Sequence, residues 1–251
     1  MSRLKALRPE PGGRVPETAM VMAAGLGTRM RPLTATQPKP LIEIAGTTLM
    51  DHVLDHLRAA GVKRVVVNVH YLADAMEAHL QRVAGSLEVV VSDERARLME
   101  TGGGLAQALP LIGDQPFVCV NSDNYWVDGP VDAIKLLASH WDDTIMDALL
   151  LMVPLARAHH HGGKGDFHLG PDGRIVSRRR PGRMAPMVWT GIQILHPRLI
   201  ADWPDGPFST NLFWTRAIEA GRAYGQVHQG LWFDVGTPGA IGRTEAMLLD
   251  G

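Results

Sequence analysis

A glycine-rich loop with three cationic side chains follows the first apolar run of the chain. It reads Ala23-Ala24-Gly25-Leu26-Gly27-Thr28-Arg29 and continues through Arg31 to Pro38-Lys39-Pro40. Glycine lets backbone N–H groups approach phosphate oxygens because no Cβ intervenes, and the cations add positive charge. The loop lacks the third glycine of a dinucleotide fingerprint and the Gly-Lys-Ser/Thr end of a P-loop. The spacing therefore predicts an anion-binding loop of another kind, with a purely structural turn as the alternative.

Two aspartates stand at the ends of apolar runs. Asp123 follows Phe117–Asn121, and Asp234 ends the run that begins at Trp232. Open α/β sheets bind ligands beyond the carboxyl ends of their strands, and carboxylates with phosphate oxygens are suitable ligands for Mg²⁺. The pair predicts a Mg²⁺ site; for either aspartate alone, a turn or helix N-cap role is the alternative.

Three further clusters have residue types that suit binding. Glu100 and the glycines Gly102–Gly104 lie between an expected strand and an expected helix. The three glycines would let a flat ring, such as a nucleotide base, approach their backbone closely, and the alternative is a simple helix start. Consecutive side chains point in different directions, so His159–His161 are interpreted as surface or loop residues rather than as a metal site. Arg178–Arg180 with Arg183 are interpreted as a solvated basic face, with attraction of anions as the alternative.

Short β-like runs alternate with helix-period segments from Ala19 onward, which is typical of a mostly parallel sheet covered by helices. The expected strands are Ala19–Ala24, Arg64–Val69, Leu87–Val91, Phe117–Asn121, Asp147–Val153, Val188–Leu195 and one near Gln226. Helices are expected from about Thr48 to Gly61, over Ala73–Val83, from Gly102, over Val131–His140, after Ser209 and from Pro238. The turn Gly170-Pro171-Asp172-Gly173 predicts an inserted hairpin over Asp166–Ser177. We expect one domain over residues 18–251 after a flexible tail, residues 1–17.

The composition excludes several classes of protein. Lys plus Arg is 25 and Asp plus Glu is 26, so the net charge is −1. That balance argues against nucleic-acid or membrane binding through a basic field. The single cysteine, Cys119, excludes an internal disulfide and a cysteine-rich zinc site. With no apolar stretch of membrane-spanning length, we expect a cytoplasmic protein; its oligomeric state is left open.

The stretch AAGLGTRMRPLTATQPKPL, from Ala23 to Leu41, resembles the signature of the sugar-phosphate nucleotidyltransferases, or NDP-sugar pyrophosphorylases. ETGGG at Glu100–Gly104, Asn121-Ser122-Asp123 and WFDVGT at Trp232–Thr237 follow in the same order, so the resemblance covers about Ala19–Leu249. It implies an α/β, Rossmann-like fold and an enzyme that joins a nucleoside triphosphate to a sugar 1-phosphate with release of pyrophosphate.

The resemblance also implies roles for individual residues. Nucleotide contacts are implied for Ala24, Gly25, Gly27, Thr28, Arg29, Lys39, Glu100, Gly102, Gly103 and Asn121. Catalytic roles are implied for Arg29, Lys39 and Asp123, and Mg²⁺ binding for Asp123 and Asp234. Contacts to the sugar are implied for Lys164, Gly165, Asp166, Thr190 and Gly191, near the inserted hairpin.

The combination of ETGGG, the segment HHGGKGDF (His160–Phe167) and WFDVGT resembles the members of this family that act in bacterial cell-wall recycling. This resemblance implies UTP and N-acetylmuramate 1-phosphate as the favoured substrates. Where other family members have Glu-Lys-Pro, this chain has Arg179-Arg180-Pro181, which argues against a second catalytic lysine. The alternatives are a guanylyltransferase acting on mannose 1-phosphate and a non-catalytic regulatory subunit that binds nucleotide sugars.

Overall fold

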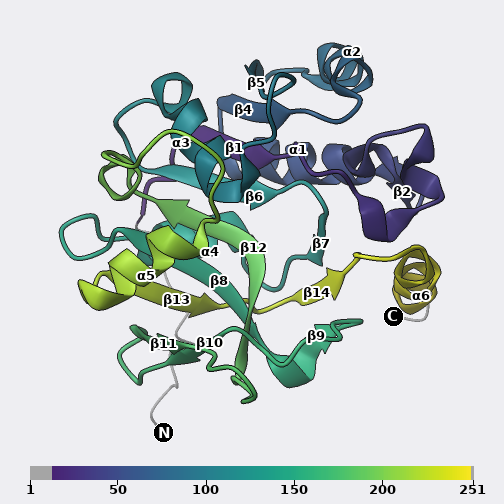
Figure 1. Ribbon diagram of the computed structural model, residues 1–251. Coiled ribbons are helices and arrows are strands. Elements are labelled where there is room, and N and C mark those ends of the chain that lie inside the picture. The colour runs from purple at the N-terminus through teal and green to yellow at the C-terminus, as the bar shows by residue number, and fades with distance from the viewer. Residues whose placement is uncertain (1–12, 250–251) are drawn as a thin grey trace, which may run out of the picture.

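One nine-stranded sheet organises the computed structural model, which describes residues 13–249 (Figure 1). Four neighbouring strands are parallel, in the order β6 (Phe117–Asn121), β1 (Thr18–Met22), β4 (Arg64–Val69) and β5 (Glu88–Asp93). On the other side of β6 lies β12 (Met187–Leu195), which is antiparallel to β6 and to β8 (Ala148–Pro154), and β13 (Ala223–Val227) is parallel to β8. The predicted mostly parallel α/β sheet is confirmed, with β12 as an antiparallel insertion.

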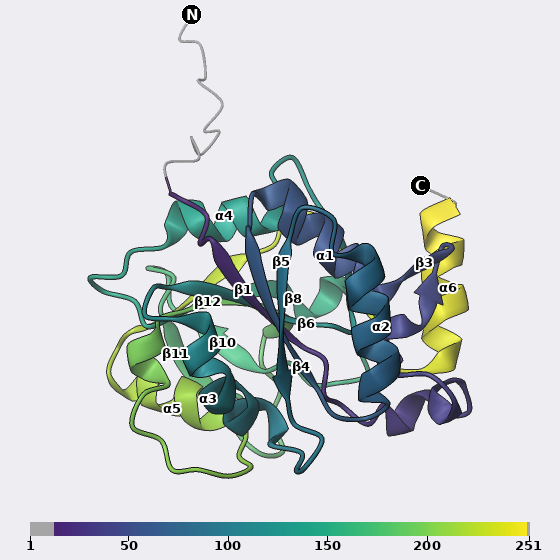
Figure 2. The ribbon, with the colours of Figure 1, turned by 90° about the horizontal axis from the view of Figure 1, so that it is seen from above.

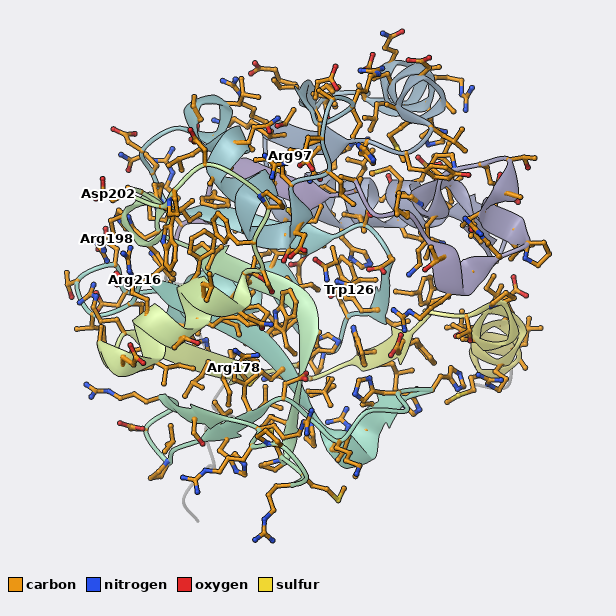
Figure 3. All side chains as sticks on the ribbon, viewed as in Figure 1. Arg97, Trp126, Arg178, Arg198, Asp202 and Arg216 are labelled. Carbon is orange, nitrogen blue, oxygen red and sulfur yellow. The ribbon has the colours of Figure 1, made fainter. Side chains whose placement is uncertain are left out.

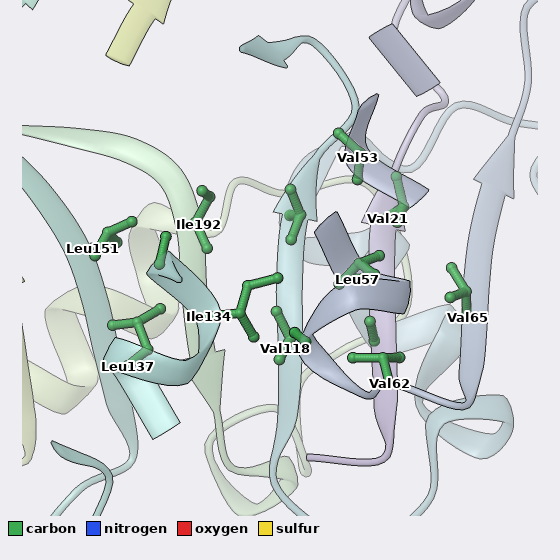
Figure 4. Packing of buried hydrophobic residues seen from close by; sticks show 14 of the residues in the cluster. Val21, Val53, Leu57, Val62, Val65, Val118, Ile134, Leu137, Leu151 and Ile192 are labelled. Atoms are coloured by element: carbon green, nitrogen blue, oxygen red, sulfur yellow. The ribbon is translucent and has the colours of Figure 1, made fainter. Parts of the chain in front are cut away.

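Helices cover both faces of the sheet (Figure 2). One face carries α1 (Leu49–Ala60), α2 (Ala73–Val83) and α4 (Ala133–His140), and the other carries α3 (Glu100–Ile112) and α5 (Asn211–Glu219). Successive strand residues point to opposite faces, so Val21, Val118 and Ile192 pack on the α1/α4 side (Figure 4), whereas Met20 and Cys119 pack on the α3/α5 side. Burial on both faces explains why these strands are almost entirely apolar.

The predicted boundaries of α1 are confirmed by its capping groups. The Thr48 side chain accepts a hydrogen bond from the Asp51 amide at 3.0 Å, and Gly61 ends the helix with φ of 100°. Both are the usual solutions for the unpaired groups at helix ends. Between these caps, Val53 and Leu57 of α1 share a hydrophobic cluster with Val21 of β1, the strand that precedes the glycine-rich loop.

The predicted hairpin is present as β10 (Phe167–Leu169) and β11 (Ile175–Arg178), and β10 joins the main sheet through β12. A second, three-stranded sheet was not predicted. It consists of β7 (Asn124–Val127), β14 (Leu231–Asp234) and β9 (Ala158–His159). The remaining elements are the short strands β2 (Glu43–Ile44) and β3 (Thr47–Thr48) and the C-terminal helix α6 (Pro238–Leu249).

The small sheet is anchored to the body of the protein by aromatic side chains. Trp126 of β7, labelled in Figure 3, stacks on His56 of α1 with ring centroids 4.0 Å apart. Phe233 of β14 is fully buried in a core shared with Met30 and Tyr125. The small sheet therefore has a fixed position relative to the glycine-rich loop that contains Met30.

The chain before β1 packs on the body from residue 13 onward. The Glu17 carbonyl accepts the amides of Lys63 and Arg64, and Val15 lies against the hydrophobic core. The predicted flexible tail therefore does not extend to residue 17, because backbone hydrogen bonds hold Glu17. Residues 1–12 of the predicted tail lie outside the described part of the chain. Between residues 13 and 249, no helix is long and apolar enough to cross a lipid bilayer.

A charge cluster around the buried Asp147 lies at the end of the sheet opposite the carboxyl ends of β1 and β6. Asp147, which precedes β8, accepts a hydrogen bond from Arg198 Nε at 2.5 Å and forms an ion pair with Arg222, whose Nε lies 2.9 Å from Asp147 Oδ1. Figure 3 shows Arg198 on the side of the molecule away from Trp126. These charges are paired with one another and hold the start of β8, so we assign them a structural role.

Candidate active site

A cleft of about 240 Å³ opens at the carboxyl ends of β1 and β6. The parallel pairing of these strands places Met22 beside Asn121, so the loops that follow them face each other. The cleft is lined by Met22, Ala23, Ala24, Gly25, Lys39, Pro40, Asn68, Leu98, Glu100, Thr101, Asn121, Ser122 and Asp123. Five of the predicted nucleotide-binding residues and the predicted metal ligand Asp123 are among them.

The glycine-rich loop combines an open position with a tight one. No atom lies within 4 Å of the place where a Cβ on Gly25 would stand, so the backbone there borders free space. Gly27 has φ of 61°, accepts a hydrogen bond from Thr34 Oγ1 at 2.8 Å, and its Cβ would lie 3.0 Å from the Lys39 Cβ. The loop therefore exposes backbone at Gly25 and folds back at Gly27 onto the segment that carries Lys39. Thr28 and Arg29 directly follow Gly27 in a short 3-10 helix, and both are exposed.

Lys39 and Asp123 form an ion pair in the cleft, with 2.5 Å between Nζ and Oδ2. The lysine side chain is 11% exposed and the aspartate side chain 35%. A nearly buried ammonium requires a negative partner, and here the partner is itself open to the cleft. An entering phosphate could therefore reach Lys39 from the side of Asp123.

The small sheet brings the second aspartate to the same place. Asn124 of β7 pairs with Asp234 of β14 in the antiparallel ladder, and Asp123 directly precedes Asn124 (Figure 1). Gly191, in the bulged part of β12, has φ of 84°, and a Cβ there would overlap the Asn124 side chain. Asn124 is 6% exposed, and its Nδ2 has no partner among the described residues. The ladder thus brings the two aspartates to the same end of the small sheet.

Asp234 is surrounded by cationic groups. His161 Nδ1 lies 3.0 Å from Asp234 Oδ2, and this hydrogen bond lowers the pKa of Asp234 against the opposing effect of burial. The positive charges of His161, Arg29 and Lys39 lower that pKa further. A Cβ on Gly236 would lie 2.9 Å from Asp234 Oδ1 and 3.1 Å from Arg29 Nη1, so aspartate and arginine face the same point. Asp234 is therefore an ionised carboxylate at neutral pH.

The histidine run divides into separate roles. Among residues 13–249, no three His, Cys, Asp or Glu side chains gather as a possible metal cluster. The His159 ring stacks on Phe233 at 5.1 Å, and His160 turns the chain with φ of 62°. His161 lies in the loop after β9, as predicted, and of the three histidines it is the one that reaches a carboxylate, that of Asp234. The sequence gave no signal for this contact, because Asp234 lies far from His161 along the chain and the two neighbouring histidines look the same in the sequence.

The donor set at the two aspartates suits Mg²⁺. Both groups supply carboxylate oxygens, and both side chains remain about one-third exposed. In phosphate-transfer sites Mg²⁺ is commonly held by one or two carboxylates together with substrate phosphates and water. Asp123 and Asp234 match that pattern.

The glycines of the ETGGG segment have a different place from the one predicted. The amides of Gly102 and Gly103 donate to the Phe208 carbonyl, at 2.7 and 3.1 Å. A Cβ at either position would collide with the loop that contains Gly206 and Phe208, and neither residue lines the cleft. These glycines permit close packing at the start of α3. Glu100, the first residue of α3, does line the cleft, and its φ of 57° is unusual for a residue with a side chain.

Two buried polar residues below the cleft were not identified from the sequence. Asn68 Oδ1 accepts the Ala23 amide at 2.7 Å, and Asn68 Nδ2 donates to Glu94 Oε1 at 2.6 Å. Glu94 Oε2 in turn accepts the Met99 amide at 3.0 Å. This chain of hydrogen bonds joins the loop after β1 to the entry of α3. Asn68 is the last but one residue of the apolar strand β4, and Glu94 directly follows β5, so both stand near the carboxyl end of a strand, as Asp123 does.

The predicted sugar-binding residues form two groups, Lys164–Asp166 before β10 and Thr190–Gly191 in β12. Asp166 has its carboxylate near His161, whose pKa it helps to raise, although the first cause is the hydrogen bond with Asp234. Gly165 has φ of 78°, and a Cβ there would overlap the Ala185 carbonyl. Lys164 is exposed, and its carbonyl accepts the Ala185 amide at 2.8 Å.

Thr190 is fully buried, and its hydroxyl donates to the Leu151 carbonyl at 2.9 Å. Its side chain therefore supports the neighbouring Gly191 and offers no free polar group. The basic run is exposed, as predicted, at Arg178, Arg179, Arg180 and Arg183.

Comparisons with known proteins agree on one family. Residues 18–163 match the family model described as nucleotidyl transferase. The chain is 45% identical over 240 residues to N-acetylmuramate alpha-1-phosphate uridylyltransferase of Caulobacter vibrioides, covering 94% of this chain and 99% of the relative. It is 36% identical to the enzyme of the same name from Neisseria meningitidis serogroup B, covering 91% and 97%. The solved structure of HddC from Yersinia pseudotuberculosis has the same fold, with a TM-score of 0.75 at 23% identity over 92% of this chain and 99% of that one.

Proposed function

The chain belongs to the nucleotidyl transferase family, and on that basis we propose that it joins UTP to N-acetylmuramate 1-phosphate, giving UDP-N-acetylmuramate and pyrophosphate. The similarity to two uridylyltransferases of that name, over nearly the whole length of each, is the observation that carries this proposal. The cleft supports this proposal because exposed backbone at Gly25 lies there together with the Lys39 ammonium and the Asp123 carboxylate, at the carboxyl ends of the central strands.

In the proposed reaction an oxygen of the sugar phosphate attacks the α-phosphorus of UTP. The new P–O bond forms as the bond to the β-phosphate bridging oxygen breaks, and pyrophosphate leaves with that electron pair. The attacking phosphate is already ionised at neutral pH, so no side-chain nucleophile or base is required. The protein must hold two polyanions in line and offset the charge at the attacked phosphate.

The chain offers separate groups for these tasks. The loop from Gly25 to Arg29 would hold the triphosphate through backbone N–H groups and the guanidinium. Lys39 Nζ, released from Asp123 by the entering nucleotide, would contact the α-phosphate. Asp123 and Asp234 would hold Mg²⁺, which when bound supplies positive charge that offsets the charge of the reacting phosphates.

The sugar is distinguished by its lactyl group, whose carboxylate adds a negative charge absent from N-acetylglucosamine 1-phosphate. Lys164 and the backbone of residues 162–165 are the proposed partners of this carboxylate, with the exposed arginines nearby. A charge-assisted hydrogen bond contributes about 1.5–3 kcal/mol, or about ten- to a hundredfold in kcat/KM.

The test is a pyrophosphate-release assay with each of the four nucleoside triphosphates, Mg²⁺ and a panel of sugar 1-phosphates. We expect UTP with N-acetylmuramate 1-phosphate to exceed UTP with N-acetylglucosamine 1-phosphate or glucose 1-phosphate by at least about tenfold. Equal rates with the sugars that lack the lactyl group would refute the sugar assignment alone. Preference for GTP and mannose 1-phosphate would establish the guanylyltransferase alternative, and no turnover with any pair would favour the regulatory subunit.

A further inference from the structure

The proposed reaction assigns no role to the histidine that contacts Asp234. We propose that His161 is the positioning residue for Asp234, fixing the orientation of its carboxylate toward the cation that it shares with Asp123. This inference rests on the proposed function, because that function supplies the cation.

The hydrogen bond has one possible direction. Asp234 is ionised and can only accept, so Nδ1 of His161 carries the proton and donates to Oδ2 at 3.0 Å. Oδ1 lies 2.9 Å from the point where a Cβ on Gly236 would stand, so glycine leaves this oxygen open. The hydrogen bond thus fixes one side of the carboxylate, while each oxygen keeps lone pairs for a cation. Hydrogen bonds of this kind orient metal ligands in many proteins.

The surrounding chain is built to hold the imidazole in place. Its side chain is 17% exposed and lies beside the Trp232 ring, with centroids 6.0 Å apart. A Cβ at Gly163 would overlap the His161 ring, so only glycine leaves room for it. The ring therefore has packing partners on more than one side in addition to the hydrogen bond.

The backbone delivers His161 to Asp234 through the small sheet. Strand β9 pairs with β14, which places Ala158 beside Trp232, two residues before Asp234. The left-handed conformation of His160, with φ of 62°, then turns the chain, and the His161 amide donates to the Ala158 carbonyl at 3.3 Å. The acceptor thus ends β14, and the donor lies two residues beyond β9, the strand that pairs with β14.

The experiment measures binding of Mn²⁺ in the presence of UTP, by the loss of the free-ion electron paramagnetic resonance signal. His161→Ala should weaken Mn²⁺ binding by about 10- to 100-fold. His161→Asn should stay within a few-fold of the parent, because its amide nitrogen stands close to the position of Nδ1. Gly163→Ala should reproduce the loss without removing the imidazole, since the added methyl displaces the ring. His159→Asn, in the same run but without a carboxylate partner, is the matched control.

Thermal melting and kinetics separate positioning from loss of structure. We expect His161→Ala to raise the Mn²⁺ or Mg²⁺ concentration needed for half-maximal rate by the same factor, with kcat recovering at saturating metal. An unchanged Mn²⁺ affinity in folded His161→Ala would overturn the inference and leave the nucleotidyl transfer standing. Equal losses in His161→Asn and His161→Ala would also overturn it, since a retained donor must rescue a positioning role. Absence of UTP-dependent Mn²⁺ binding in the parent would remove the metal site and this inference together.

Discussion

Asp123→Asn removes the charge of this carboxylate while keeping its size. In the parent, Asp123 Oδ2 accepts a charge-assisted hydrogen bond from Lys39 Nζ at 2.5 Å. An asparagine carbonyl can still accept from the ammonium, so Lys39 keeps a partner. The substitution therefore tests the charge at this position with little change in packing.

The two expected effects differ in size. Replacing the ion pair by a hydrogen bond from the Lys39 ammonium to an uncharged amide oxygen costs about 1 kcal/mol of folding free energy, which corresponds to a fall in Tm of about 2–4 °C in a chain of this length. Loss of one of two proposed carboxylate ligands should lower kcat by on the order of 10² or more, equivalent to about 2.7 kcal/mol in the barrier. The reaction should thus be affected far more than the fold.

The assay is pyrophosphate release with UTP, N-acetylmuramate 1-phosphate and Mg²⁺, with thermal melting measured on the same preparation. Asp114→Asn is the matched control, because Asp114 is exposed before β6, at the opposite end of the strand from Asp123. Activity of Asp123→Asn within a few-fold of the parent would refute the metal-ligand assignment. A collapse of Tm in Asp123→Asn would show that the charge serves folding instead.

Four other changes have defined outcomes. Lys39→Met should lower kcat more than it raises KM for UTP, because the ammonium is proposed to meet charge that builds at the α-phosphate; an increase in KM alone would reduce Lys39 to a binding residue. Chelation should abolish pyrophosphate release and added Mg²⁺ should restore it, and activity that survives exhaustive chelation would contradict the metal requirement. Deletion of residues 1–17 should lower Tm relative to deletion of residues 1–12, because only the longer deletion removes the Glu17 carbonyl that accepts the Lys63 amide. Equal melting curves of the two deletion variants would contradict this. Burial raises the pKa of the Cys119 thiol to about 12, so iodoacetamide at pH 8 should leave it unmodified in the native protein and alkylate it in urea, as measured by mass spectrometry. Rapid labelling of the native protein would disprove the burial of this thiol.

Local patterns in the sequence were sufficient for most of the fold. Apolar runs predicted the strands of the main sheet because their side chains are buried on both faces, and periodic apolar positions with Thr48 and Gly61 predicted α1 closely. The glycine-rich loop, Lys39 and Asp123 could be identified as site residues because glycine and charged groups at the end of a buried strand are seldom explained by packing alone. The antiparallel direction of β12 could not be predicted, since its residues are apolar in either direction.

What the sequence determined by itself was the set of groups available for chemistry: a glycine-rich loop with cationic side chains, two carboxylates and the family signature. Tertiary structure alone decided which of these groups meet. The pairing of β7 with β14 brings Asn124, and with it the preceding Asp123, to Asp234. The pairing of β9 with β14 brings His161 to the second carboxylate. Tertiary structure also assigned Gly102 and Gly103 to packing against the Phe208 loop. Residue spacing along the chain carries no information on such contacts, because strand pairing and close packing depend on segments that are distant in sequence.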